Sequence, residues 1–275
     1  MTESSEYIRE MTVSYPLLKS TIDQAIQSLG LPKGSNGLDA GCGIGLQVPT
    51  LVEEVGPHGY ITGLDISPKF IRYAKDEMND IGLSKQVSFK TGDIRDLPFE
   101  DSNFDWVWSS CCAGYAATLD PHLVIRELAR VVNPGGTVAI FAWSSERILP
   151  GYPVLEARLG ATSPGIAPYQ SDMDPEIHFS RGLGWFRNAG LEDLKVRGFV
   201  GDTHAPLREE IRNALVSLFA MRWPGVETEL NQADLAEYQR LCLPDSPEFI
   251  VDHPDYYGFF TCSLFTGKLP IQHNG

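Results

Sequence analysis

Glycine occupies every second position of residues 41–45, directly after a short apolar run that contains Asp39. Because glycine has no Cβ, such a segment can adopt positive φ angles and let a ligand approach the backbone closely. A helix that follows the segment presents free N–H groups to an anionic part of that ligand. The pattern therefore predicts a strand, a tight glycine loop and a helix, with a ligand bound above the loop.

The spacing of the glycines differs from the dinucleotide fingerprint G-x-G-x-x-G, because Leu46 stands where the third glycine of that fingerprint would be. Asp39 adds a negative charge at the end of the predicted strand, which suits a ligand that carries a cation as well as a carboxylate. Asp65 closes the next predicted strand, where a carboxylate can accept hydrogen bonds from both hydroxyls of a ribose. We expect a nucleoside-containing ligand other than a dinucleotide.

Strand-like and helix-like segments alternate through the first half of the chain. Apolar spacing predicts helices over residues 16–29, 47–55, 68–82 and 121–132. Strands are predicted over residues 60–65, 86–90, 104–110 and, after a turn at 133–136, 137–143. This alternation predicts an α/β fold with a mostly parallel sheet covered on both faces, whose ligands bind at the carboxyl ends of the strands.

The alternation is interrupted twice in the second half. Residues 144–180 are rich in proline and glycine, and residues 205–250 contain one stretch, 207–220, with helical spacing. A helix over 182–189 and strands over 191–200 and 255–267 restore the pattern. We interpret the two interruptions as insertions.

Composition excludes several classes of function. The chain has 275 residues with 22 basic and 36 acidic side chains, a net charge of −14 that opposes binding to nucleic acid. The five cysteines have no CxxC spacing and the six histidines are dispersed, so neither a disulfide framework nor a metal site is expected. No apolar run reaches the roughly 20 residues of a membrane helix, and the first ten residues lack a signal pattern. We expect a soluble cytoplasmic protein that does not bind membranes.

Four segments together resemble a known family. In order, they are LDAGCGIG, GLDIS, TGDIRDLPFEDSNFDWVWSS and ELARVVNPGGTVAIF, within residues 37–143. They are similar to the motifs of class I S-adenosylmethionine-dependent methyltransferases, particularly the small-molecule group that includes quinone-biosynthesis enzymes. The resemblance implies a Rossmann-like, doubly wound, mostly parallel seven-stranded sheet with an antiparallel last strand and helices on both faces. It also implies S-adenosylmethionine as cofactor and a small-molecule methyl acceptor.

The predicted elements and the extent of the resemblance together indicate how the chain is organised. We expect a single methyltransferase domain over residues 1–275, with a cofactor-binding half at 30–143. The insertions at 144–180 and 205–250 are expected to form a lid over the acceptor.

The cofactor-binding residues implied by the resemblance come from the ends of four strands. The loop at 39–45 is assigned to the methionine part, Asp65 to the ribose, residues 66 and 92–94 to the adenine, and two serines to the neighbourhood of the sulfonium. The full set is Asp39, Gly41, Cys42, Gly43, Gly45, Asp65, Ile66, Gly92, Asp93, Ile94, Ser109 and Ser110. A purely structural turn is the alternative for the loop, and a turn cap is the alternative for Asp93.

A general base would assist transfer to a hydroxyl or an acidic carbon, and His122 and Tyr115 are the catalytic candidates. His122 is also explained as a residue in the first turn of the predicted helix that Pro121 begins. The pair Cys111 and Cys112 raises the alternative of a covalent nucleophile, but the proline that precedes such a cysteine in cytosine-carbon methyltransferases is replaced by Ser110. We therefore interpret both cysteines as small packing residues.

The acceptor and the oligomeric state are not specified by the sequence. Aromatic and methionine side chains suit an apolar or planar acceptor, but such residues more often belong to a core: Tyr7, Tyr15, Trp143, Tyr169, Phe219, Met221 and Trp223. Two other functions stay open, an aminopropyl-type transferase of the same fold and a non-catalytic module that binds S-adenosylmethionine.

Overall fold

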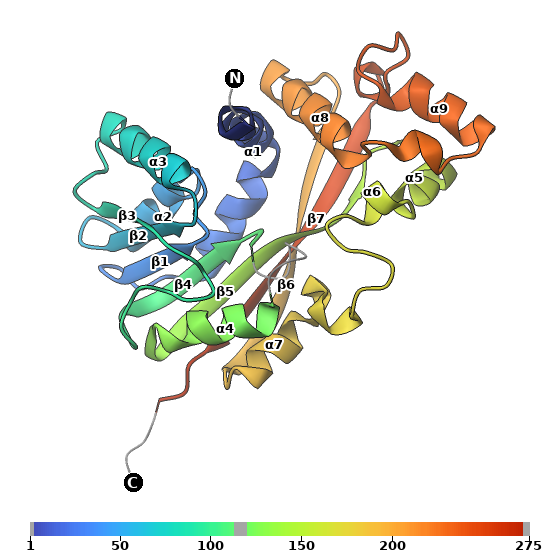
Figure 1. The fold of residues 1–275 in the computed structure, drawn as a ribbon. Helices are drawn as coiled ribbons and strands as arrows, with labels where there is room; N and C mark the ends of the chain where they lie inside the picture. Colours follow the sequence, from blue (N-terminus) through green and yellow to red (C-terminus); the bar gives the residue numbers. More distant parts are fainter. Residues whose placement is uncertain (1–2, 113–119, 272–275) are drawn as a thin grey trace. The chain divides into compact units, whose positions relative to one another are not determined.

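A computed structural model describes residues 3–112 and 120–271 of the chain and contains a seven-stranded sheet (Figure 1). The strand order is β3-β2-β1-β4-β5-β7-β6, and six strands are parallel with the last antiparallel. This sheet confirms the predicted fold class. The strands are β1 (Asn36–Ala40), β2 (Tyr60–Asp65), β3 (Val87–Thr91), β4 (Phe104–Ser110), β5 (Val132–Arg147), β6 (Glu192–His204) and β7 (Tyr257–Lys268).

Helices connect most of these strands. They are α1 (Glu3–Ser28), α2 (Val48–Val55), α3 (Pro68–Asp80), α4 (Pro121–Arg130), α5 (Pro153–Gly160), α6 (Ser163–Ile166), α7 (Gly182–Asn188), α8 (Glu209–Arg222) and α9 (Gln232–Cys242). Single 3₁₀ turns cover Pro175–Ile177, Phe179–Arg181, Val226–Thr228 and Ile250–Asp252. Within the described residues, no helix combines the length and the apolar character needed to cross a membrane.

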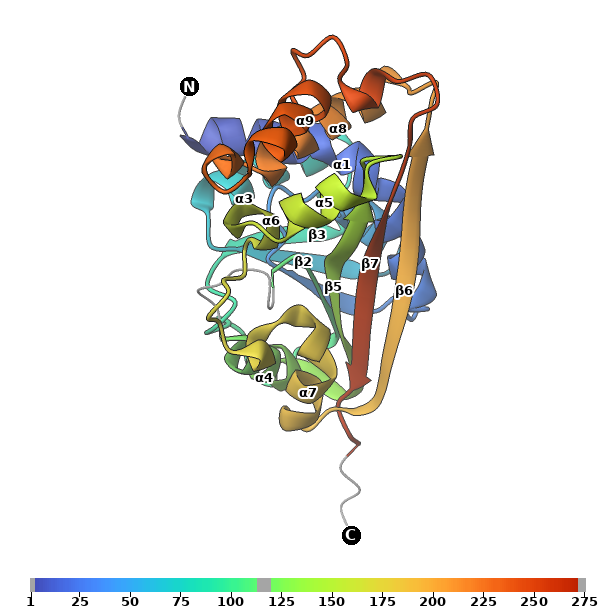
Figure 2. The same cartoon turned by 90° about the vertical axis from the view of Figure 1, so that its right-hand side faces the viewer.

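The chain forms two compact units. We call residues 22–143, 174–199 and 263–275 the core unit, and residues 1–21, 144–173 and 200–262 the insert unit. Strands β5, β7 and β6, which lie side by side in the sheet (Figure 2), each continue from one unit into the other.

In the core unit, α2 and α3 lie on one face of the sheet and α4 and α7 on the other (Figure 1). The starts of these helices follow from local sequence. The Ser67 hydroxyl accepts a hydrogen bond from the Phe70 N–H at 3.4 Å, and Pro68 begins α3. Asp120 caps α4 in the same way, and Pro121 is its first residue. Both predicted helix starts are confirmed.

The centre of the sheet depends on a glycine opposite a tryptophan. Gly37 of β1 pairs with Trp106 of β4, whose indole is 1% exposed and donates to the Ser35 hydroxyl at 2.9 Å. A Cβ atom on Gly37 would lie 2.0 Å from the Trp106 ring. Position 37 therefore accepts only glycine while the tryptophan keeps this place.

Two predicted elements were wrong in their extent, and one helix was not predicted. The first helix begins at Glu3, so Pro16 lies inside it; a proline removes one backbone hydrogen bond, which a long helix tolerates. The predicted turn at 133–136 is instead an irregularity within β5, where the pairing with β4 shifts between Phe104 and Trp106. In the second insertion, where helical spacing was assigned only to residues 207–220, the structure adds α9.

The insert unit has an aromatic core of its own. The Phe219 ring lies 5.7 Å from that of Trp223 and 5.3 Å from that of Phe249, centroid to centroid, in edge-to-face geometry. Phe219 and Trp223 are 2% and 3% exposed, whereas Met221 is exposed. For Phe219 and Trp223 the structure supports the core alternative over a role in acceptor binding.

The packing around Gly37 makes a first prediction. Gly37→Ala is expected to lower the free energy of unfolding by about 1–3 kcal/mol, because the added methyl must displace Trp106 from a close-packed site. Gly184→Ala is the matched control, since a Cβ there meets no atom within 4 Å and alanine favours the helix by about 0.5–1 kcal/mol. Urea unfolding of both variants measures the difference; equal stability of the two would contradict the proposed clash.

Candidate functional site

The glycine loop between β1 and α2 has the expected backbone. Gly41, Gly43 and Gly45 have φ angles of +80°, +54° and +80°, a backbone conformation that residues other than glycine rarely adopt. The N–H groups of Gly41 and Cys42 donate to the Leu64 carbonyl of β2 at 2.8 and 2.9 Å. These hydrogen bonds hold the loop on the neighbouring strand. The glycines have no side chains that would keep a ligand away from the loop backbone.

Asp39, at the end of β1 just before this loop, has a buried carboxylate with one unpaired oxygen among the described residues. Its side chain is buried at 2% exposure, and no donor within residues 3–112 and 120–271 reaches its Oδ2 atom. Burial, and secondly the charge of Asp65, raises the pKa of Asp39 to about 7. A buried carboxylate oxygen without a donor destabilises a fold, so its retention points to a ligand that supplies a donor or a cation.

Asp65, at the end of β2, joins two parts of the site. Its Oδ2 accepts from the Gly43 N–H at 2.9 Å and its Oδ1 from the Ser67 N–H at 2.8 Å. Each oxygen keeps a further lone pair that can accept from a ligand hydroxyl. Asp65 therefore holds the glycine loop against the start of α3 and is still able to bind a ligand.

Two neighbouring positions contribute differently. Ile66 is 66% exposed, an unusual state for a large apolar side chain and one that suits contact with a flat ring. Cys42 is half-buried, and burial together with Asp39 and Asp65 raises the pKa of its thiol. The thiol is therefore a neutral packing group.

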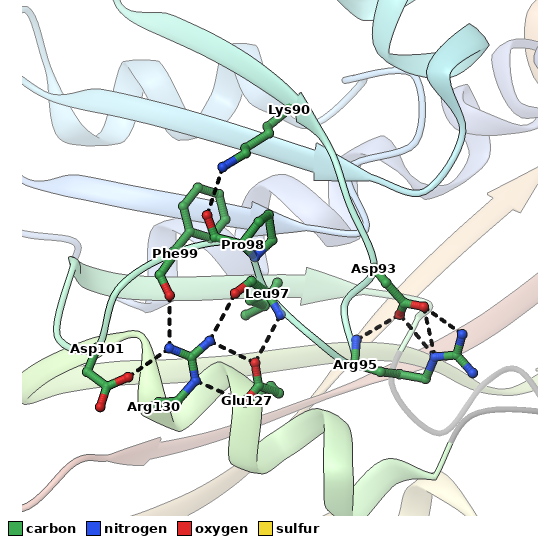
Figure 3. Close-up of polar contacts among 9 residues, drawn as sticks. All are labelled: Lys90, Asp93, Arg95, Leu97, Pro98, Phe99, Asp101, Glu127 and Arg130. Atoms are coloured by element: carbon green, nitrogen blue, oxygen red, sulfur yellow. Dashed lines mark hydrogen bonds and ion pairs between the residues drawn. The ribbon is translucent and has the colours of Figure 1, made fainter.

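After β3 the chain turns at Gly92, Asp93 and Ile94. The Gly92 N–H donates to the Asp65 carbonyl at 3.0 Å, and Ile94 is buried at 7% exposure. Asp93 accepts from the Arg95 N–H at 2.8 Å and from the Arg95 Nε at 3.0 Å (Figure 3). These hydrogen bonds lower the pKa of Asp93. The turn-cap alternative thus describes what Asp93 does in this structure, and Arg95 is a partner that the sequence did not indicate.

An ion-pair network fixes the segment that follows this turn (Figure 3). Arg130 of α4 binds the Glu127 carboxylate at 2.8 Å and Asp101 at 2.8 Å, and donates to the Phe99 carbonyl at 2.9 Å. Lys90 donates to the Pro98 carbonyl at 2.7 Å. The network holds residues 97–101 on α4, and sequence reasoning did not foresee it, because its members lie about 30 residues apart.

At the end of β4 the two predicted serines differ. Ser109 is buried and its hydroxyl donates to the Ala40 carbonyl at 2.8 Å, which ties β4 to the end of β1. Ser110 is half-buried. Cys112 lies against the loop, since a Cβ on Gly41 would be 2.7 Å from its sulfur. Burial and Asp65 raise the pKa of Cys112 to about 12, which disfavours the covalent-nucleophile alternative for this thiol.

The catalytic candidates are placed unequally. His122 lies in the first turn of α4, its ring 6.5 Å from that of Trp185 in α7, as the structural alternative predicts. Tyr115 lies outside the described residues. Across the part of the chain that the structure describes, no three His, Cys, Asp or Glu side chains gather as a metal site requires.

Comparisons with a family model and with a related protein both indicate a methyltransferase. Residues 31–167 match the model of a methyltransferase domain family. A demethylmenaquinone methyltransferase of Listeria welshimeri is 30% identical over 166 residues, which covers 55% of this chain and 69% of that protein.

Two solved structures share the fold. The structure of an S-adenosylmethionine-dependent methyltransferase from Aquifex aeolicus has a TM-score of 0.50 at 20% identity, covering 72% of this chain and 91% of the other. A geranyl diphosphate methyltransferase solved with GPP and sinefungin has a TM-score of 0.52 at 17% identity, covering 91% and 78%.

The state of Asp39 makes a second prediction. Its pKa is raised on folding from 3.8 to about 7, so between these values the folded protein binds more protons than the unfolded chain. The ligand-free protein therefore loses stability as the pH rises through this window, by on the order of 2–4 kcal/mol. Asp39→Asn is expected to remove that loss, and thermal unfolding at pH 5 and pH 8 measures it.

Asp76→Asn is the control for this experiment, because Asp76 is an exposed carboxylate of α3. It should keep the pH dependence of the wild type. If Asp39→Asn keeps it as well, the assignment of the shift to Asp39 is wrong.

Proposed function

This chain belongs to the class I S-adenosylmethionine-dependent methyltransferases, and we propose that its glycine loop, Asp39 and Asp65 bind the cofactor for transfer of a methyl group to a small molecule. S-adenosylmethionine supplies a methyl group already activated on a sulfonium. The protein then has to bind and orient the two substrates and exclude water.

The observation that carries this proposal is the Oδ2 atom of Asp39. It is buried at the end of β1, and no donor of the described chain pairs with it. The amino group of S-adenosylmethionine carries the N–H donors and the positive charge that such an oxygen needs. Cofactor binding would keep Asp39 ionised, since a nearby cation favours the charged form of a carboxylate.

Other residues fit the remaining parts of the cofactor. Asp65 has lone pairs left for two ribose hydroxyls, and the exposed Ile66 offers an apolar surface for the adenine. Asp93 is already engaged by Arg95, so its contact with the adenine amino group would share a carboxylate oxygen with that arginine. Ser109 contributes through the strand ends that it joins rather than through a free hydroxyl.

For the acceptor, we propose a small molecule bound with the help of the insertions at 144–180 and 205–250. The Listeria relative is named for demethylmenaquinone, which makes that compound the first acceptor to test. The roles of His122 and Tyr115 as a base stay predictions. We also propose a cytoplasmic location, which the free cysteines in the described chain support.

The deciding experiment is calorimetric titration of the protein with S-adenosylmethionine, S-adenosylhomocysteine and NAD. Micromolar binding of the first two and none of NAD is expected, followed by transfer of a labelled methyl group to an acceptor. Binding of NAD, or of none of the three, would contradict the proposal. Cofactor binding without transfer to any acceptor would indicate a non-catalytic module.

Asp65→Ala is expected to weaken cofactor binding by about 2–4 kcal/mol, because it removes charge-assisted hydrogen bonds to the ribose. The same change removes the acceptor of the Gly43 and Ser67 N–H groups, so thermal unfolding is measured alongside calorimetry. Asp76→Ala serves as the control and should leave the affinity unchanged. An unaltered affinity in Asp65→Ala would rule out the ribose role.

A further inference from the structure

The carboxylate of Asp93, which is proposed to meet the adenine amino group, already accepts from several donors. Its Oδ1 atom accepts from the Arg95 N–H at 2.8 Å and from the Arg95 Nε at 3.0 Å, and its Oδ2 atom accepts from Nε at 3.0 Å and from Nη2 at 2.5 Å (Figure 3). A carboxylate has about four lone-pair positions, shared between its two oxygens. A further donor must therefore displace or weaken one of the contacts that Arg95 makes.

The turn that carries Asp93 does not depend on the Arg95 side chain. The Asp96 N–H donates to the Asp93 carbonyl at 3.2 Å, and the Arg95 N–H donates to the Asp93 carboxylate. Any residue other than proline at position 95 supplies that second N–H. The guanidinium therefore adds contacts only to a carboxylate two positions away.

Arg130 shows how an arginine with a structural role behaves in the same region. Its guanidinium binds Glu127 within α4 and also donates to three acceptors of the segment 97–101, about 30 residues away. In the part of the chain that the structure describes, the hydrogen bonds and ion pairs of the Arg95 side chain all go to Asp93, and 45% of that side chain is exposed. The Arg95 pair can therefore open without disturbing contacts between distant segments.

The pair lies beside the residues assigned to the ribose and the adenine. The Gly92 N–H, one position before Asp93, donates to the Asp65 carbonyl at 3.0 Å. Ile66 is 66% exposed, and 29% of the Asp93 side chain is exposed. All of these residues belong to the core unit. An adenine bound here, with its amino group at Asp93 as proposed, meets a carboxylate whose acceptor positions Arg95 already occupies.

We propose that Arg95 competes with the 6-amino group of the cofactor for Asp93 and so limits how strongly the site distinguishes adenine from a purine without that group. This inference rests on the proposed function and deepens it, because it assigns a specificity role within the cofactor site. Arg95 acts through Asp93, and no contact with the reacting atoms is assigned to it. An exposed arginine–carboxylate pair contributes little free energy, so the competition is weak enough for the cofactor to win.

The test compares two ligands that differ at one position, S-adenosylhomocysteine and its analogue with hydrogen in place of the 6-amino group. Calorimetry with the whole chain measures the affinity for each. Arg95→Ala is expected to bind S-adenosylhomocysteine about 2- to 5-fold more tightly than the wild type, because the amino group no longer displaces an exposed ion pair. The analogue has no donor for Asp93, so its affinity should stay the same.

Lys195→Ala is the matched control for this experiment. Lys195 forms an exposed ion pair of 2.8 Å with Asp193, also two positions away and also in the core unit. Its loss removes one positive charge and one local pair, and it should leave the affinity for both ligands unchanged. In an Asp93→Ala background, Arg95→Ala should change neither affinity, because the competition acts through Asp93.

The outcomes separate this inference from the proposed function. Failure of S-adenosylhomocysteine to bind the wild type overturns the proposed function and the role of Arg95 with it. If S-adenosylhomocysteine binds, but Arg95→Ala weakens its binding, leaves it unchanged or tightens both ligands equally, the inference alone is overturned. A gain that is confined to S-adenosylhomocysteine, and that is absent in Lys195→Ala and in the Asp93→Ala background, supports the inference.

Discussion

Two backbone N–H groups, those of Gly43 and Ser67, donate to the single carboxylate of Asp65, and the geometry of the candidate site depends on this arrangement. One bond holds the glycine loop that follows β1, and the other holds the start of α3. The carbonyl of Asp65 also accepts from the Gly92 N–H, so the turn after β3 is tied to the same residue. The ends of β1, β2 and β3 are thereby held together by one residue, at the carboxyl edge where parallel sheets bind ligands.

The negative charge of Asp65 disfavours the ionised form of the neighbouring Asp39. The charge of Asp65 adds to the effect of burial, and together they raise the pKa of Asp39 to about 7. A fold selected for stability alone would place a neutral side chain there, since an unpaired buried charge destabilises the protein. A cationic ligand reverses that balance, because Asp39 and Asp65 then both attract it. The same two carboxylates destabilise the ligand-free protein and favour the complex, as functional sites commonly do.

The sequence predicted those features that depend on neighbouring residues. The alternation of strands and helices, the helix starts at Pro68 and Pro121 and the positive φ angles of the glycines are all local, and the structure confirms them. The family resemblance over residues 37–143 is confirmed by the match over 31–167. The full length of α1 was not predicted, because proline is common in the first turn of a helix and Pro16 therefore indicated its start.

Features that join distant residues could not be predicted in this way. Arg130 and the segment 97–101 lie about 30 positions apart, and nothing in either stretch indicates the other. The engagement of Asp93 by Arg95 is local, but the sequence favours it no more than a ligand contact. Whether a carboxylate oxygen has a hydrogen-bond donor is likewise a property of the packed structure, so the sequence did not show that the Oδ2 atom of Asp39 lacks one among the described residues.

The glycine loop and the second insertion differ in their similarity to the family. Asp39 lies in the core unit, within the segment that resembles the family and matches its model, whereas residues 205–250 lie beyond residue 167. A cofactor shared by a whole family requires a shared pocket, and an acceptor that differs among its members requires residues that differ. In this chain the glycine loop proposed to form the shared cofactor pocket is evident from the sequence. The insertions carry no comparable pattern, which is why the cofactor could be inferred from the sequence and the acceptor could not.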